Sequence, residues 1–232
     1  MNQIKKTILA LVIFTLFITK GFAQSEDKLG SWYIYNGFFK FSPKVELFLE
    51  SQLRNYEVFS NPETFFLRPY FSYNINKNIQ PSLGLEYHKA WTYDEVPENK
   101  ISTNEFRVTL QLMVFQNIGR VNLQHRYRYE FRTVDGDNLR RMRYRIQATI
   151  PLNSKTMTKG TFFANTNAEL MLDTNPLLAI NQNRLYVAGG YQFTDNLNLQ
   201  LGYLAVFRPG TVHSRLQFFV THKIWFFDKD VN

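Results

Sequence analysis

The stretch VNLQHRYRYEFR, residues 121–132, alternates strictly between two kinds of side chain. Its odd positions are apolar or aromatic apart from His125, and its even positions are polar or charged. The alternation resumes at residues 139–150, so that six arginines share one face across the two segments. A period of two is typical of a β-strand whose two faces meet different surroundings. This pattern predicts a wall that separates lipid from a polar interior.

The N-terminus predicts a signal peptide at residues 1–23. Lys5 and Lys6 supply its positive charge, and residues 8–18 form an apolar core that includes one threonine. Gly21-Phe22-Ala23 places small residues at the two positions that a signal peptidase reads. The apolar run is shorter than the roughly 20 residues that a membrane helix needs. Residues 24–232 are therefore predicted to be the mature chain and to form one domain.

Composition narrows the class of protein further. The chain has no cysteine, which excludes disulfides, thiol catalysis and thiolate metal sites. Loss of three signal-peptide lysines lowers the formal net charge from +8 to +5, which is only mildly basic. No later apolar run is as long as a membrane helix. An exported, strand-rich chain with 16% aromatic residues fits a bacterial outer membrane.

Alternating segments recur along the whole mature chain. They are predicted as strands near 30–41, 45–58, 63–75, 79–91, 102–116, 120–133, 139–152, 161–172, 183–193, 197–207 and 212–227. Soluble proteins have strands of about five to six residues, whereas a tilted strand needs about 9–11 residues to cross the hydrocarbon. The length of the segments predicts an all-β, antiparallel transmembrane β-barrel. A soluble periplasmic barrel or sandwich is the alternative.

The connections between segments also alternate in length. Short turns are expected at 42–44, 76–78, 117–119 and 194–196. Longer polar connections at 92–101 and 173–182 are expected to be extracellular loops, and 153–160 a rather long periplasmic connection. The last segment ends in Ile224-Trp225-Phe226-Phe227, an aromatic end of the sort that bacterial barrels use for assembly.

The number of strands is left at ten to twelve. Eleven segments can be counted, but bacterial single-chain barrels have even numbers of strands. The first segment is the least certain, because Trp32, Ile34 and Phe38 share its inward face with polar residues. It either threads the lumen or belongs to a longer segment broken at Gly37. Twelve strands are favoured over ten.

Extending the alternation to every segment predicts a charged lumen. Its arginines and glutamates are expected to be Glu46, Glu50, Arg54, Arg68, Glu86, Glu105, Arg107, Arg126, Arg128, Glu130, Arg132, Arg141, Arg143, Arg145, Glu169, Arg184 and Arg215. One interpretation is a structural network of ion pairs that sets the strand register. The other is a site for anions, because the guanidinium fork matches phosphate. In a narrow barrel such side chains would largely fill the bore.

No catalytic, metal or cofactor residue is predicted. Barrel lipases and lipid A deacylases place a serine two residues after the histidine, but Ala90 follows His88 and Arg215 follows His213 at that spacing. His213 and Ser214 are adjacent, so a strand would send them to opposite faces. The chain has no metal-binding motif and no glycine motif that holds phosphate. Arginine and tyrosine alternate onto opposite faces, which argues against binding of nucleic acid.

Several segments are similar to one known family. They are Leu29-Gly30-Ser31-Trp32, residues 50–54, residues 125–130, Arg143-Tyr144-Arg145, residues 182–186 and residues 198–203, in this order. Together they resemble an uncharacterised family of Bacteroidota outer-membrane barrels, domain of unknown function 2490. The resemblance spans nearly the whole mature chain. It implies the fold and the location, and it transfers no catalytic residues.

These observations favour a structural or accessory barrel of the cell envelope. The alternative is a narrow, porin-like channel or transport pore that prefers anions, and a lipid-modifying hydrolase is a third hypothesis. The expected location is the bacterial outer membrane. Expected partners are outer-membrane lipid, lipopolysaccharide and envelope proteins, and not nucleic acid.

Overall fold

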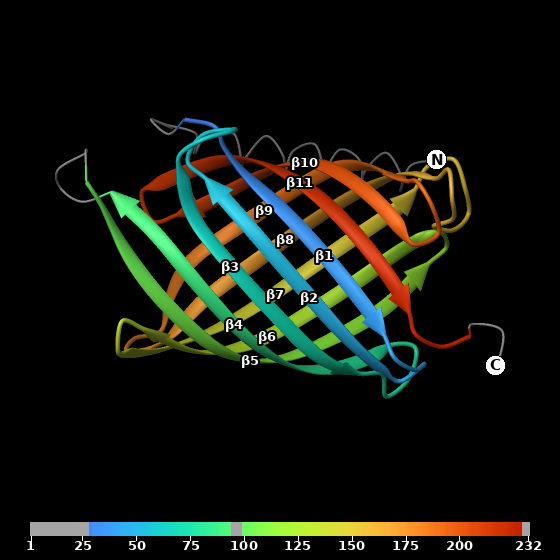
Figure 1. Cartoon of the computed structure of the whole chain (residues 1–232), viewed down its shortest axis with the longest axis horizontal. Helices are drawn as coiled ribbons and strands as arrows, with labels where there is room; N and C mark the ends of the chain where they lie inside the picture. Colours follow the sequence, from blue (N-terminus) through green and yellow to red (C-terminus); the bar gives the residue numbers. More distant parts are fainter. Residues whose placement is uncertain (1–27, 94–98, 229–232) are drawn as a thin grey trace, which may run out of the picture.

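The chain forms one closed β-barrel of eleven strands (Figure 1). The computed structural model describes residues 28–93 and 99–228, so the predicted signal peptide lies outside the described residues. In chain order the strands are β1 Gly30–Lys40, β2 Val45–Asn55, β3 Pro62–Tyr73, β4 Ile79–Tyr93, β5 Lys100–Ile118, β6 Val121–Val134, β7 Asp137–Pro151, β8 Phe162–Asn175, β9 Ala179–Gln192, β10 Leu197–Arg208 and β11 Thr211–Trp225.

The predicted fold class, a closed all-β barrel, is confirmed. Every predicted segment overlaps one of the observed strands, and the strands contain 11 to 19 residues. Their outward positions alternate with buried inward ones, as the period of two indicated. Within the described ranges, no helix is long and apolar enough to span a membrane.

The expected even strand number is wrong. Successive strands reverse direction, so β1 and β11 run the same way. They pair in parallel from Gly30 with Arg215 to Lys40 with Trp225, along the whole length of β1. Figure 1 shows the two strands side by side, β1 in blue and β11 in red. An even number is required only when the closing pair is antiparallel, and parallel pairing is only slightly less stable per residue.

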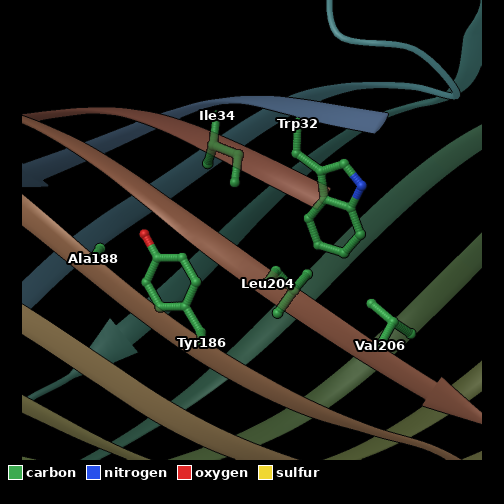
Figure 2. Packing of buried hydrophobic residues seen from close by; sticks show 6 residues of the cluster. All are labelled: Trp32, Ile34, Tyr186, Ala188, Leu204 and Val206. Carbon is green, nitrogen blue, oxygen red and sulfur yellow. The ribbon is translucent and has the colours of Figure 1, made fainter. Parts of the chain in front are cut away.

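The first strand is a full member of the wall, so it neither threads the lumen nor breaks at Gly37. Two apolar residues on its inner face, Trp32 and Ile34, pack with apolar residues that two other strands supply. Figure 2 shows these residues, which we call the seam cluster: Trp32, Ile34, Tyr186, Ala188, Leu204 and Val206. They come from β1, β9 and β10, and Phe219 of β11 packs against them. The barrel interior therefore has one apolar side.

Aromatic pairs reinforce the closing seam on the outer side. The rings of Tyr33 and Phe218 stack with their centroids 5.2 Å apart. Beyond the ends of the same strands, Phe41 and Phe226 stack at 5.1 Å. Such contacts stabilise a pair by about 0.5–1.5 kcal/mol beyond the area that they bury. The parallel pair is thus held by side chains on both faces as well as by its backbone.

The connections gather at two rims. We call the rim at which β1 begins the N-terminal rim, and the rim at which β11 ends the C-terminal rim. The long loop predicted at 173–182 is wrong, because β8 continues to Asn175 and β9 begins at Ala179. Of the predicted loop 92–101, residues 94–98 lie outside the described residues, and the flanking residues extend β4 and β5. The connection between β7 and β8 is long and lies at the C-terminal rim.

Glycines on the inner face make room for aromatic rings. A Cβ atom on Gly84 would lie 2.4 Å from the Tyr70 ring, and one on Gly190 would lie 2.2 Å from the Phe163 ring. Tyr70 faces Gly84 across β3 and β4, and Phe163 faces Gly190 across β8 and β9. The structure shows that each glycine lets a neighbouring ring lie against the wall.

Replacing Gly84 by alanine is expected to destabilise the barrel by about 1–3 kcal/mol, the usual cost of overpacking. The added methyl group would push the Tyr70 ring and its hydroxyl away from Glu86. The matched control is Gly189→Ala, where the added Cβ meets no atom within 4 Å. The measurement is the temperature at which heating changes the mobility of each variant on a denaturing gel. Equal transition temperatures for the two would contradict this account.

Candidate functional site: the charged lumen

All seventeen charged residues predicted for the lumen occupy inward positions of the wall. They lie on β2 to β9 and on β11. Eleven of them are arginines and six are glutamates, which leaves an excess of five positive charges. The structure brings most of them together around three glutamates, each shared by several arginines.

Glu86 is the first shared carboxylate, and its exposed fraction is zero. Arg68 reaches its Oε2 from β3 at 3.3 Å, and Arg107 approaches from β5 at 3.7 Å. The Thr109 hydroxyl donates to Oε1 at 2.8 Å, and the Tyr70 hydroxyl donates to the same oxygen. A buried carboxylate is stable only with such partners. Glu86 therefore ties β3, β4 and β5 together from inside.

Glu130 and Glu169 continue the network around the wall. Arg143 donates to Glu130 at 2.7 Å, and Arg141 lies 3.2 Å from the same carboxylate. On its other side, Arg143 contacts both carboxylate oxygens of Glu169 at 2.9 Å. Arg126 of β6 donates to Glu169 at 2.6 Å, two strands away from its own. One arginine thus bridges two buried carboxylates.

Several further predicted residues join the edges of this network. Glu105 accepts hydrogen bonds from Arg107 at 2.6 and 2.8 Å and from Arg132. Arg68 donates to Glu50 at 2.7 Å. The separate contacts are Glu46 with Lys40 at 3.2 Å, Arg184 with Glu169 at 3.6 Å and Arg215 with Glu63 at 3.7 Å.

Arginines also reach across the lumen to aromatic rings. The guanidinium of Arg128 on β6 lies 4.6 Å from the ring centre of Tyr70 on β3. The guanidinium of Arg184 on β9 lies 5.0 Å from the ring centre of Trp32, and that of Arg54, which pairs with Trp32 from the neighbouring strand β2, lies 3.7 Å from it. Cation–π contacts of this kind hold guanidinium groups in desolvated places. They connect the charged side of the lumen with the seam cluster.

A cavity of about 380 Å³ lies within the lumen, in the half toward the N-terminal rim. Arg208 at its edge is the last residue of β10 and is exposed. The lining comprises eight arginines, one histidine and three further residues, namely Arg54, Arg68, Arg107, Arg132, Arg141, Arg143, Arg184, Arg208, His88, Met171, Asn181 and Gln182. No carboxylate is among the described residues that line it. We call this space the arginine chamber.

A family model described as "Protein of unknown function (DUF2490)" matches residues 29–217. The chain belongs to this family. The DUF2490 match begins just before β1 and ends within β11, so it covers nearly the whole barrel. No curated protein and no solved structure matches the chain.

Two histidines face inward, His88 and His213, and the His213 Nε2 lies 3.3 Å from the Thr211 hydroxyl. His88 Nε2 lies 3.1 Å from Glu86, and its ring stacks on Phe66. His213 faces inward, whereas the Ser214 hydroxyl is on the outer face and lies 2.7 Å from the Tyr203 hydroxyl. In the described part of the chain, no group of three or more His, Cys, Asp or Glu residues could hold a metal ion.

Some lumen residues were missed by the sequence interpretation. Tyr70 continues the inward series of Phe66 and Arg68, so the period of two was a sufficient signal for it. Arg208 lies one residue beyond the predicted end of its strand. Asn181 and Gln182 fell within the predicted loop 173–182. Arg208, Asn181 and Gln182 line the chamber near the ends of their strands, where boundaries are hardest to predict.

The substitution Glu130→Gln is expected to destabilise the barrel by about 3–5 kcal/mol, because it leaves buried arginines without their carboxylate. Glu57→Gln is the matched control. Its carboxylate is exposed at the N-terminal rim, where a hydrogen bond from Lys28 holds its pKa below the usual value. In detergent, the control variant should be half unfolded at the same urea concentration as the parent protein. A Glu130 variant as stable as the parent would show that the network contributes little.

Proposed function

We propose that this protein is a structural or accessory outer-membrane β-barrel of a Bacteroidota cell envelope, and that its own side chains seal its lumen. The observation that carries the sealing is the ion-pair network inside the wall. Glu86 and Glu130 have no exposed surface although they lie inside a barrel. Barrels of about eight strands are filled by side chains, whereas porins of 16 to 18 strands leave a water-filled channel. An eleven-stranded barrel lies between these sizes but nearer to eight, and the eleven arginines of the predicted lumen set point into this one.

The outer wall supports the membrane location. Large apolar side chains are exposed along the middle of the strands, among them Leu85, Leu110 and Leu201. A soluble protein rarely exposes a continuous apolar surface of this extent. The charged residues on the outer face of the described strands are Lys89, Lys100 and Arg140, and all three lie near the N-terminal rim. Charge near the membrane midplane would cost about 2–4 kcal/mol for each residue.

Aromatic residues cluster at both rims. Tyr191 contacts both Phe162 and Phe193 at the C-terminal rim. Tyr56 and Tyr93 contact each other at the N-terminal rim. Aromatic girdles at both interfaces are typical of barrels in outer membranes. The partners that fit this wall are outer-membrane lipid, lipopolysaccharide and envelope proteins.

The chain is expected in the outer-membrane fraction, and its folded form should migrate differently from its heated form on a denaturing gel. Mild-detergent extraction followed by a native pull-down should recover an envelope protein at constant stoichiometry. A chain recovered with soluble periplasmic proteins would overturn the location. A chain that always migrates alone would overturn the accessory role.

The second candidate function is a narrow channel that prefers anions, and the arginine chamber is the observation that favours it. Planar bilayers separate the two candidates. A sealed barrel is expected to give flat recordings. Current steps that prefer anions and weaken in Arg141→Glu or Arg143→Glu would overturn the sealing and establish the channel.

The proposed function is not enzymatic. Two histidines of the described strands are engaged in contacts within the wall, His88 with Glu86 and His125 with the Tyr144 hydroxyl at 2.9 Å. The adjacent His213 and Ser214 face opposite sides of the wall. A lipid hydrolase needs a nucleophile and a base within hydrogen-bond reach of each other. Release of fatty acid by the purified barrel from phospholipid or lipid A would contradict this proposal.

A further inference from the structure

We propose that the arginine chamber binds a soluble ligand that carries two or more phosphate groups. The inference goes beyond the sealing role, because a barrel can bind a ligand at one rim without conducting ions. It uses the lumen geometry and does not depend on which membrane holds the barrel.

The first step is the charge of the chamber. Eight arginines from seven strands line it, and no carboxylate is among its described lining residues. The glutamates that pair with these arginines lie beside the chamber and are already shared. The predicted lumen set has five more arginines than glutamates. Buried charge without compensation is strongly unfavourable, so an anion in the chamber would offset it.

The second step is the state of two particular arginines. Arg54 donates from Nε to the Gln52 side chain at 3.1 Å, and it has no carboxylate within 4 Å among the described residues. Arg184 approaches Glu169 only to 3.6 Å, and its buried Nε has no hydrogen-bond partner among them. Both guanidinium groups lie against the Trp32 ring. Trp32 therefore lies against two guanidinium groups that make few hydrogen bonds to the protein, at the edge of the chamber.

The third step is the chemistry of the ligand. Guanidinium forks match the oxygens of phosphate, with two parallel hydrogen bonds. Each phosphate group carries about −1.5 to −2 charges at neutral pH, so two groups would offset most of the excess. The chamber volume of about 380 Å³ falls within the range of small-ligand sites. The closed sheet separates the chamber from the hydrocarbon, which favours a soluble ligand over a lipid headgroup.

Trp32 provides the measurement. In a Trp91→Phe, Trp225→Phe background it is the remaining tryptophan of the chain. Titration with sodium pyrophosphate in detergent, at constant ionic strength, is expected to change the Trp32 emission in a saturable way. Arg54→Gln and Arg184→Gln should each weaken binding by about tenfold, the effect of losing one charge-assisted hydrogen bond. Arg54→Lys keeps the charge without the fork and should lie between.

Arg140→Gln is the matched control, because Arg140 is adjacent to the chamber residue Arg141 but lies on the outer face. It should bind pyrophosphate like the parent. The gel mobility shift shows that each variant is folded, so lost binding is not lost structure. A flat titration of the parent, or equal loss in Arg140→Gln, would overturn the site.

Competing anions test the ligand class. Citrate or sulfate that binds as tightly as pyrophosphate would overturn the assignment to phosphate groups. Lipopolysaccharide that displaces pyrophosphate more effectively than free phosphate compounds do would overturn the assignment to a soluble ligand. If the bilayer recordings are flat and pyrophosphate does not change the Trp32 emission, the sealing role stands and the phosphate site is overturned. If current steps appear and the Trp32 emission saturates with pyrophosphate, the sealing role is overturned and the phosphate site stands.

Discussion

The parallel pairing of β1 with β11 is the constraint on which the rest of the structure depends. An open sheet leaves unpaired backbone N–H and C=O groups along its two edges, and closure into a barrel pairs them. With eleven strands, the two edges can meet only in parallel. The inner side of this junction is apolar and its outer side carries stacked rings. Closure therefore divides the lumen into an apolar side at the seam and a charged side opposite.

The charged side also sets the register of the strands. Glu50 pairs directly with Arg68, Glu86 with Arg107, and Glu130 with Arg141. Because side chains alternate faces, a slip of one residue between neighbouring strands would send these charges into the outer wall. The cost of such a slip is high on both faces, since it would also bring leucines into the lumen. The network thus specifies one arrangement of strands, whatever its net contribution to stability.

Much of this architecture could be predicted from the sequence, because the face of the sheet on which a side chain lies depends only on a period of two. The inward placement of Arg126, Arg128 and Glu130 follows directly from that period. Strand number does not, since it depends on how the two ends of the sheet meet. Residues 173–182 contain turn-forming residues, yet Asp173 pairs with Arg141 through a bulge in the β7–β8 pairing. The contact of Arg128 with Tyr70 spans the lumen, and no local pattern indicates such a contact.

The lumen changes along its axis in a way that distinguishes binding from permeation. Near the C-terminal rim its inward residues include amides and hydroxyls such as Gln80, Ser72 and Thr149. Near the N-terminal rim the arginine chamber has positive charge without lining carboxylates. Between the two lies the layer in which Glu169 joins Arg126 and Arg143. An anion that enters the chamber meets favourable charge at once, whereas the next layer along the axis holds arginines that are already paired with a buried carboxylate. The geometry therefore supports a site that fills from one side more strongly than a path through the wall.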